Sequence, residues 1–268
     1  MRIRTLFAIC VLGWATLPVM ADTVTVHIFS NNFSTNVSGQ PIVEPHINVG
    51  DTIHWKWDSG FHNTIAAAKQ TDTWTSGAAT SGPHSFDHTF NKPGTFWYYC
   101  SVHGSDKGDG TGSGMAKRIF VETIVSGTVT LQECLKPAQS VDFEFRPTDN
   151  TAKFTRTVIL NADGSFALKN LPAKAYKLAI KGQKWLRKVM DVDTSVGNVT
   201  TVAVTLTAGD TNNDNKVDLD DLGNLANAFD TKPGDTLYDA NSDLNCDDLV
   251  NLDDLGLLAL NFDTAGDP

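Results

Sequence analysis

The sequence predicts a mainly β protein made of two β-sandwiches and a small helical tail. Three observations support this architecture. Between residues 22 and 208, short runs of alternating apolar and polar residues are separated by turn signals, such as Asn-Lys-Pro-Gly at 91–94 and Asp-Gly at 163–164. The content of these runs changes near residue 124. From residue 209 onward, the segment Asp210 to Phe229 recurs without a gap as Asp243 to Phe262, 33 residues later.

Residues 1 to 21 have the three parts of an export signal. Arg2 and Arg4 are positive, Leu6 to Leu17 is apolar, and Ala21 is a small residue suited to cleavage. The apolar run is too short to span a bilayer. A buried N-terminal helix is the alternative. We therefore expect cleavage after Ala21, a secreted, periplasmic or cell-surface location, and no membrane insertion of the mature chain.

The first expected domain covers residues 22 to 124. Its strand-like runs are 23–28, 52–57, 86–100 with an internal turn, and 118–122. Several short strands punctuated by turns are typical of a β-sandwich.

The second expected domain covers residues 125 to 208. Its strand-like runs are 127–131, 141–146, 154–160, 165–168, 176–180 and 199–206. The run Asp-Gly-Ser-Phe-Ala-Leu at 163–168, with Leu-Pro at 171–172, resembles carboxypeptidase-regulatory-like or transthyretin-like sandwiches. No catalytic spacing is visible in it, so we interpret this domain as a spacer.

One group of residues in the first domain has the composition of a copper site. Cys100 and His103 follow an aromatic strand, His62 lies upstream, and Met115 lies downstream. Two imidazoles, a thiolate and a weak thioether form the trigonal site, with a long axial bond, that holds copper for electron transfer. The alternatives are zinc, which would favour more cysteine than this domain contains, or no metal. The other histidines of the domain are interpreted as surface or packing residues: His27, His46, His54, His84 and His88.

These motifs resemble the plastocyanin and azurin family of type 1 blue-copper proteins, the cupredoxins. Gly-Phe-His-Asn-Thr at 60–64, Pro-Gly-Thr-Phe-Trp-Tyr-Tyr-Cys-Ser-Val-His-Gly at 93–104 and Gly-Met at 114–115 carry the resemblance. It implies a Greek-key sandwich, one copper, a shielding role for Asn63, and electron exchange with a redox partner protein through His103. The implied ligands are His62, Cys100, His103 and Met115. Residues 104 to 114 form a longer segment than in plastocyanin, and we expect a loop that gates partner access.

The tail has the pattern of two calcium-binding loops. Oxygen-bearing side chains occupy positions 1, 3, 5, 9 and 12 of each copy, and position 7 offers a backbone carbonyl, as hard cations require. Position six is Asn215 or Asp248, residue types that tolerate the left-handed conformation. The expected calcium ligands are Asp210, Asn212, Asp214, Lys216, Asp218 and Asp221 in the first copy, and Asp243, Asn245, Asp247, Leu249, Asn251 and Asp254 in the second.

The alternative for the tail is a disordered acidic segment. Residues 209 to 268 contain 2 basic and 15 acidic residues, a net charge of −13. Disorder does not require apolar residues at helical spacing after each loop, and the tail has them. They are Leu222, Leu225 and Phe229, then Leu255, Leu258 and Phe262.

Two loop-then-helix units, with a strand rather than a helix before the first, resemble the type I dockerin family over residues 209 to 268. The resemblance implies two Ca²⁺ ions and docking to a cohesin-like partner. The pairs Leu219-Asp220 and Leu252-Asp253 are identical in the two copies and are expected on the docking face.

The mature chain keeps three cysteines, Cys100, Cys134 and Cys246. If Cys100 binds a metal, the other two can pair across domains, stay free, or form an intermolecular bridge. Cys246 occupies position four of its loop and is expected to face outward.

Three functions compete on this sequence. An electron carrier that is not an enzyme is the leading hypothesis. A copper oxidoreductase would need a second copper or an open coordination position. A copper-binding, adhesion or scaffold module would have no redox role. No nucleic-acid partner is expected.

Overall fold

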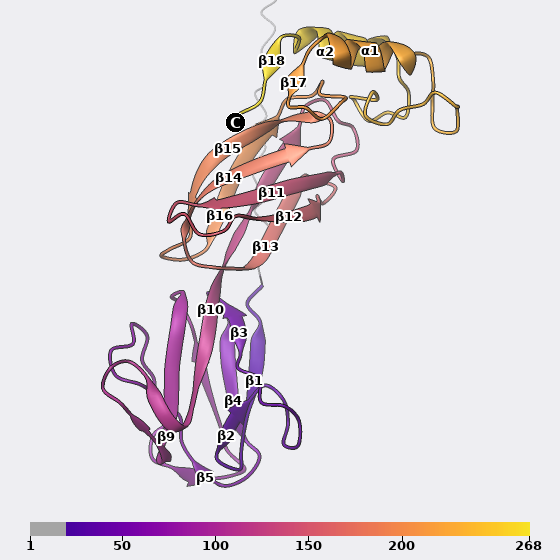
Figure 1. The fold of residues 1–268 in the computed structure, drawn as a ribbon. Coiled ribbons are helices and arrows are strands. Elements are labelled where there is room, and N and C mark those ends of the chain that lie inside the picture. Colours follow the sequence, from indigo (N-terminus) through magenta and orange to yellow (C-terminus); the bar gives the residue numbers. More distant parts are fainter. Residues whose placement is uncertain (1–19) are drawn as a thin grey trace, which may run out of the picture.

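The computed structural model describes residues 20–268, so the predicted export signal lies almost entirely outside the described residues. The described chain is mainly β, as predicted, and Figure 1 shows two β-rich bodies in a row with the helices at the far end. Among the described residues, neither of the two nine-residue helices has the length and apolarity needed to cross a membrane.

The first body is a sandwich of two sheets with a small extra strand pair. One sheet has the order β2-β1-β4-β8, and in the other β9 lies between β6 and β10, with β3 on the far side of β10. The strands are β1 Thr23–Phe29, β2 Asn32–Ser34, β3 His46–Asn48, β4 Thr52–Trp57, β6 Ile65–Ala66, β8 Ser85–Thr89, β9 Gly94–Asp106 and β10 Gly112–Leu131. The extra pair is β5 Phe61–His62 with β7 Thr80–Ser81.

Aromatic side chains fill the space between these sheets. The alternation in β4 buries Ile53, Trp55 and Trp57, because successive side chains of a strand point to opposite faces. Tyr98 packs edge-on against Trp55 with 5.7 Å between the ring centroids. Cys100 and Met115 belong to this same buried cluster. Two of the four predicted copper ligands therefore belong to this aromatic core.

Strand β10 joins the two sandwiches without a linker. Its first half pairs with β9, and its second half pairs with β13 and β16. The expected boundary between residues 124 and 125 therefore falls inside a continuous strand. Gly127 explains how β10 passes so close to β16, since a Cβ at this position would lie 1.9 Å from the Val202 carbonyl oxygen.

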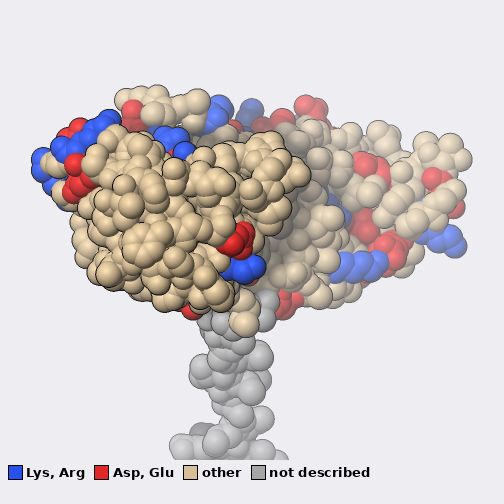
Figure 2. Space-filling model, turned by 90° about the horizontal axis from the view of Figure 1, so that it is seen from below, with Lys and Arg blue, Asp and Glu red and all other residues tan. Residues whose placement is uncertain are grey.

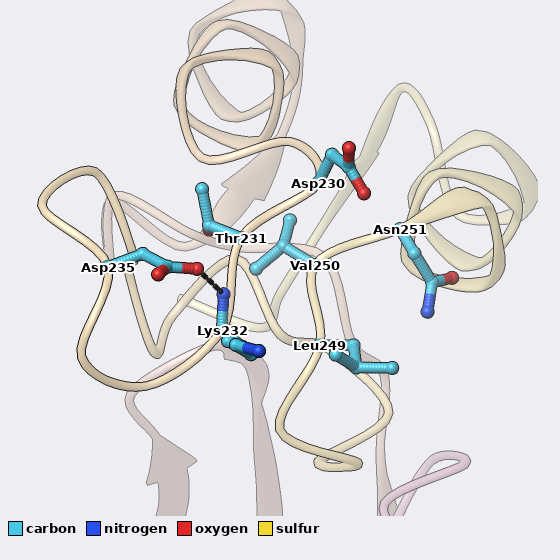
Figure 3. A pocket seen from close by; sticks show the side chains of 7 residues that line it. All are labelled: Asp230, Thr231, Lys232, Asp235, Leu249, Val250 and Asn251. Carbon is cyan, nitrogen blue, oxygen red and sulfur yellow. Dashed lines mark hydrogen bonds between the residues drawn. The ribbon is translucent and has the colours of Figure 1, made fainter.

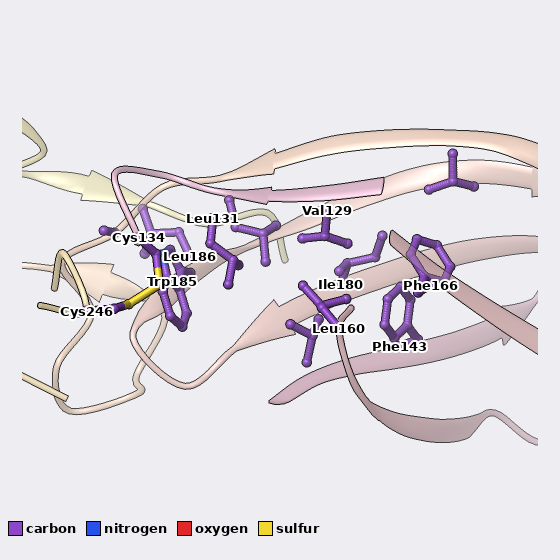
Figure 4. Close-up of a cluster of buried hydrophobic side chains, with 14 of the residues drawn as sticks. Val129, Leu131, Cys134, Phe143, Leu160, Phe166, Ile180, Trp185, Leu186 and Cys246 are labelled. Atoms are coloured by element: carbon purple, nitrogen blue, oxygen red, sulfur yellow. A yellow bond between two sulfur atoms is a disulfide. The ribbon is translucent and has the colours of Figure 1, made fainter. Parts of the chain in front are cut away.

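The second body is also a sandwich. Strand β10 here lies between β13 and β16, and these three strands face a sheet of order β12-β11-β14-β15. The bounds are β11 Ser140–Pro147, β12 Phe154–Ile159, β13 Ser165–Leu171, β14 Ala175–Gly182, β15 Trp185–Asp193 and β16 Val199–Leu206. Strand β15 is missing from the sequence prediction, because its central residues, half-buried without alternation, give no period-two signal. Figure 4 shows Phe143, Phe166 and Ile180 in the core of this sandwich.

The tail contains two short helices and a two-stranded pairing. Its elements are β17 Lys216–Val217, α1 Leu219–Asn227, α2 Leu252–Leu260 and β18 Thr264–Ala265. Both helices follow the loops where they were predicted, and a strand, β16, precedes the first loop. The expectation for Phe229 and Phe262 was wrong, because the helices end before them and both side chains are exposed.

The tail and the second sandwich share one hydrophobic core. Leu225, Leu244 and Leu258 of the tail belong to the same buried cluster as Trp185 and Leu186 of β15. The aromatic core of the first sandwich forms a separate cluster. The tail is therefore packed onto the second sandwich rather than appended to it.

A disulfide also joins the tail to the second sandwich. Cys134, just after β10, bonds to Cys246 in the second tail loop, and Figure 4 shows this bond beside Trp185. The sequence left three possibilities open for these two cysteines, and the structure shows the intrachain disulfide across domains. The expected outward position of Cys246 was wrong, since its residue is only 3% exposed.

Candidate metal centre

Three of the predicted copper ligands come together at one end of the first sandwich. The Cys100 Sγ lies 3.7 Å from the Nδ1 atoms of both His62 and His103, and the two Nδ1 atoms are 3.1 Å apart. Metal bonds to nitrogen and sulfur are about 2.0–2.3 Å long, so three ligands around one ion lie roughly 3–4 Å apart. The triangle is therefore of the size that one metal ion needs. Among residues 20–268, no other group of three His, Cys, Asp or Glu side chains has ligand atoms this close.

An irregular strand pairing creates the site. Tyr99 of β9 pairs with Ala116 of β10, and Gly104 pairs with Gly114. Between these pairs, four residues of β9, which include Cys100 and His103, lie opposite the single residue Met115 of β10. Bulges of this kind redirect side chains.

Glycine is required on both sides of this bulge. A Cβ on Gly104 would lie 2.6 Å from the Met115 carbonyl oxygen. Gly114 has φ +70°, and its Cβ would meet the His103 carbonyl oxygen at 2.6 Å.

His62 reaches the site from the short strand β5 and is 1% exposed. The indole nitrogen of Trp57 donates to the carbonyl oxygen of His62 at 3.0 Å. Gly60 leaves room for the ring, because a Cβ there would lie 2.2 Å from His62 Nε2. Burial lowers the pKa of His62, and the neighbouring His103 lowers it further. Both effects favour the neutral ring, which is the form that binds a metal.

Asn63 connects the two halves of the site. Its side-chain oxygen accepts from the Ser101 backbone N–H at 2.9 Å, and its amide nitrogen donates to the Gly77 carbonyl at 3.0 Å. It therefore fixes the residue after Cys100 relative to the residue after His62. Asn63 is itself buried, with 2% of its surface exposed.

The segment 104–114 is a hairpin rather than the loop that was expected. Asp106 pairs with Gly112, and the Lys107 N–H donates to the Thr111 carbonyl oxygen at 3.0 Å. Polar side chains anchor it to the segment after β6. The Asp106 carboxylate accepts from the Ala68 N–H at 2.8 Å, and Gln70 donates to the Gly110 carbonyl at 2.7 Å. The glycine-rich composition of the segment gave no sign of these hydrogen bonds to residues distant in the sequence.

The surface at this end of the sandwich is almost uncharged. Segments 59–68, 73–86, 93–105 and 110–116 contain no Lys, Arg, Asp or Glu. Figure 2 shows the end of the molecule where β5 lies as a broad neutral area with charges near its rim. His103 is exposed, and Phe61 and Val102 are each 51% exposed.

The two tail loops are built alike. The position-twelve residues Asp221 and Asp254 are fully buried, and each carboxylate accepts backbone N–H groups from positions two, three and nine of its own loop. Position six has φ +75° at Asn215 and +71° at Asp248, as the sequence predicted. Position nine, Asp218 or Asn251, caps the following helix and completes a capping box.

The position-one aspartates show how a cation would fit. One oxygen of Asp210 accepts from the Asn215 N–H at 3.0 Å and from Lys181 Nζ at 2.6 Å, and its other oxygen is buried without a partner. Asp243 receives the matching bonds from the Asp248 N–H at 3.1 Å and the Tyr238 hydroxyl at 3.2 Å. Burial raises the pKa of Asp210. A buried carboxylate oxygen without a donor is costly unless a cation compensates it.

A shallow pocket lies at the connection between the two copies (Figure 3). Asp230, Thr231, Lys232 and Asp235 line one side, and residues 249–251 of the second loop line the other. The Lys232 N–H donates to Asp235, which closes a turn at its rim. The pocket lies in the tail, and none of the residues that line it belongs to the His62 group.

No family model matches the chain. Two structures of interface mutants of a type II cohesin-X-dockerin complex from Acetivibrio cellulolyticus match 54% of this chain and 97% of the matched chain, with 21% identity and TM-scores of 0.41 and 0.42. An oxidized amicyanin mutant matches 37% of this chain and 81% of its own length, with 22% identity and a TM-score of 0.27. These likenesses concern β-sandwich folds alone and say nothing about activity.

Proposed function

We propose that this chain is an exported electron carrier that is not an enzyme. It holds one type 1 copper between His62, Cys100 and His103, with Met115 as the axial ligand. The observation that supports this proposal is the triangle of one sulfur and two nitrogens, with sides of 3.1 to 3.7 Å, beside a buried Met115. Zinc sites of three protein ligands rarely contain this combination, whereas electron-transfer copper sites do.

The surroundings favour a site that changes oxidation state without moving. Bound copper would supply a one-electron couple. Asn63 and Trp57 hold the backbone around the ligands, and the aromatic core behind Cys100 excludes water. His103 presents its ring at the neutral surface, so we propose this ring edge as the route for the electron. A redox partner protein would dock against Phe61 and Val102.

The visible spectrum tests the proposal directly. The copper-loaded chain should show the intense thiolate-to-copper band of a type 1 site and should titrate with one electron per chain. A colourless metal complex would favour the copper-binding or scaffold alternative. Turnover of an oxidisable substrate with dioxygen would favour an oxidoreductase.

Met115→Leu should keep both copper and colour but raise the reduction potential. The thioether is a weak axial ligand, and its removal disfavours Cu(II) more than Cu(I). Leucine fills a similar buried volume, so the fold should be retained at a cost below about 1.5 kcal/mol. Redox titration of the variant checks this, and an unchanged potential would mean that Met115 is not the axial ligand.

Val102→Lys should slow electron self-exchange about tenfold at low ionic strength. Two copies exchange electrons through their neutral ends, and a lysine beside each His103 makes these ends repel. Added salt should restore most of the rate because the new charges are exposed and screened. Line broadening of mixed oxidised and reduced samples measures the rate. Leu135→Lys near the tail is the control, since Leu135 is 71% exposed against 51% for Val102, and an equal effect there would contradict the proposed route.

We further propose that the tail binds two Ca²⁺ ions and docks to a cohesin-like partner outside the cytoplasm. The identical hydrogen bonds of Asp221 and Asp254 in the two loops support this second function. Leu219 and Leu252, at the first turn of each helix, are both 71% exposed, which suits a docking face.

Single substitutions Leu219→Ala and Leu252→Ala should cost little binding to a purified cohesin-type module if either helix can engage it. The double substitution should then abolish binding. The surroundings of the two leucines differ, because Leu252 lies in a groove with Glu133, Leu135 and Leu260. Complete loss with one single variant would therefore identify a single docking orientation.

A further inference from the structure

Only one of the two tail loops is bonded covalently to the second sandwich. Position four is Asn213 in the first loop and Cys246 in the second, and both adopt left-handed conformations, with φ +66° and +60°. Cys246 lies between Asn245 and Asp247, two of the proposed calcium ligands. Its disulfide to Cys134 therefore enters the second loop between two ligand positions.

The residues next to Cys134 hold the same stretch of loop. The Leu135 N–H donates to the Asn245 carbonyl oxygen at 2.8 Å, and Lys136 Nζ lies 2.5 Å from an Asp248 carboxylate oxygen. Cys134 is itself anchored, because its N–H donates to the carbonyl oxygen of Leu131 at the end of β10. Residues 134–136 thus form a rigid clamp on positions three to six of the second loop.

The first loop is held to the second sandwich by noncovalent contacts. The Asn215 side-chain oxygen accepts from the Arg187 N–H at 2.8 Å, and the Asn215 carbonyl accepts from the Gly266 N–H at 3.0 Å. Lys181 contacts Asp210 at position one. None of these contacts is covalent, and none involves residues 134–136.

We infer that the clamp of residues 134–136 is a positioning element of the second calcium site. The inference rests on the proposed calcium binding of the tail. A flexible loop loses conformational entropy when it wraps an ion, and a cross-link inside the loop removes part of that loss in advance. Calcium affinity also rises with the rigidity of the site. The disulfide therefore raises the calcium affinity of the second loop and leaves that of the first loop unchanged.

The test compares the two loops within one chain. Asp221→Ala removes the first site and isolates the second, whereas Asp254→Ala isolates the first. Into each background we would introduce Cys134→Ser with Cys246→Asn, which gives the second loop the position-four residue of the first. Asparagine accepts the left-handed conformation, so the change removes the cross-link without adding backbone strain. Calorimetric titration with calcium of the full copper-loaded chain measures each site alone.

The pair of changes should weaken calcium binding about tenfold or more in the Asp221→Ala background, in line with the loss of a supporting contact around a metal site. The Asp254→Ala background should change less than about twofold. Equal weakening of both sites would overturn the inference and indicate general loosening of the tail. No change in either background would overturn it as well.

Two further results separate this inference from the calcium proposal. If the parent chain binds no calcium, the calcium proposal fails and this inference fails with it. If the parent binds two ions but the pair of changes has no selective effect, only this inference fails. Should the disulfide-free variants fold poorly, the Asp221→Ala chain with its copper already reduced to Cu(I) serves as the second measurement. Reduction of its disulfide by a phosphine should then give the same tenfold loss.

Discussion

Cys100→Ser should abolish the intense visible band of the copper-loaded protein and leave the β fold intact. The thiolate is the chromophore and the strongest ligand of the proposed site, and a serine hydroxyl does not replace it. Cys100 is fully buried in the aromatic core, so the new hydroxyl costs stability of about 1–3 kcal/mol if it finds no partner. The core around Trp55 and Tyr98 is large enough to tolerate this loss. Absorption and circular dichroism spectra of the same sample measure both effects.

A matched control uses the other two cysteines. Cys134→Ser with Cys246→Ser removes the disulfide, which lies in the second hydrophobic core, and should leave the visible band unchanged. If Cys100→Ser stayed intensely coloured, the ligand assignment would be wrong. If the disulfide variant lost its colour, the copper site would depend on the junction between the second sandwich and the tail.

The candidate site was predictable because its signals are local or ordered along the chain. Cys100 and His103 are three residues apart at the end of an aromatic strand, and His62 follows a strand in a recognisable motif. The left-handed positions Asn215 and Asp248 followed from the repeat alone, since position six of such a loop requires that conformation. At each of these positions the type of residue and its place in a local motif were enough for the prediction.

The parts that sequence reasoning missed depend on contacts between distant residues. Composition suggested a domain boundary at residue 124, but strand β10 continues through it. The backbone of β10 pairs with β9 before this residue and with β16 after it, so the strand is not interrupted there. The glycine-rich segment after His103 resembled a loop, and only the contacts of Asp106 and Gln70 make it an anchored hairpin. The pairing of Cys134 with Cys246 spans 112 residues, a separation over which no local pattern informs.

Removing calcium should unfold the tail while the copper band persists. The tail has a net charge of −13, which two Ca²⁺ ions would reduce by four. Asp210, Asp221 and Asp254 are fully buried, and removing calcium takes away part of the charge that compensates their burial. Asp210 then keeps Lys181, whereas Asp221 and Asp254 keep their backbone N–H donors. A ligand present at a thousand times its Kd stabilises the folded state by about 4 kcal/mol per site. Loss of both sites therefore removes stability comparable to that of a whole small domain.

The shared core decides how far this unfolding spreads. Leu225, Leu244 and Leu258 share one buried core with Trp185, so the melting temperature of the second sandwich should also fall when the tail unfolds. The first sandwich has its own core and should keep both its fold and its colour. A calcium-selective chelator, followed by circular dichroism, limited proteolysis and the visible spectrum, measures all three parts, with readdition of calcium as the control. Loss of the copper band together with the tail would show that β10 transmits unfolding between the two cores, whereas an unaltered tail would mean that packing and the disulfide hold it without calcium.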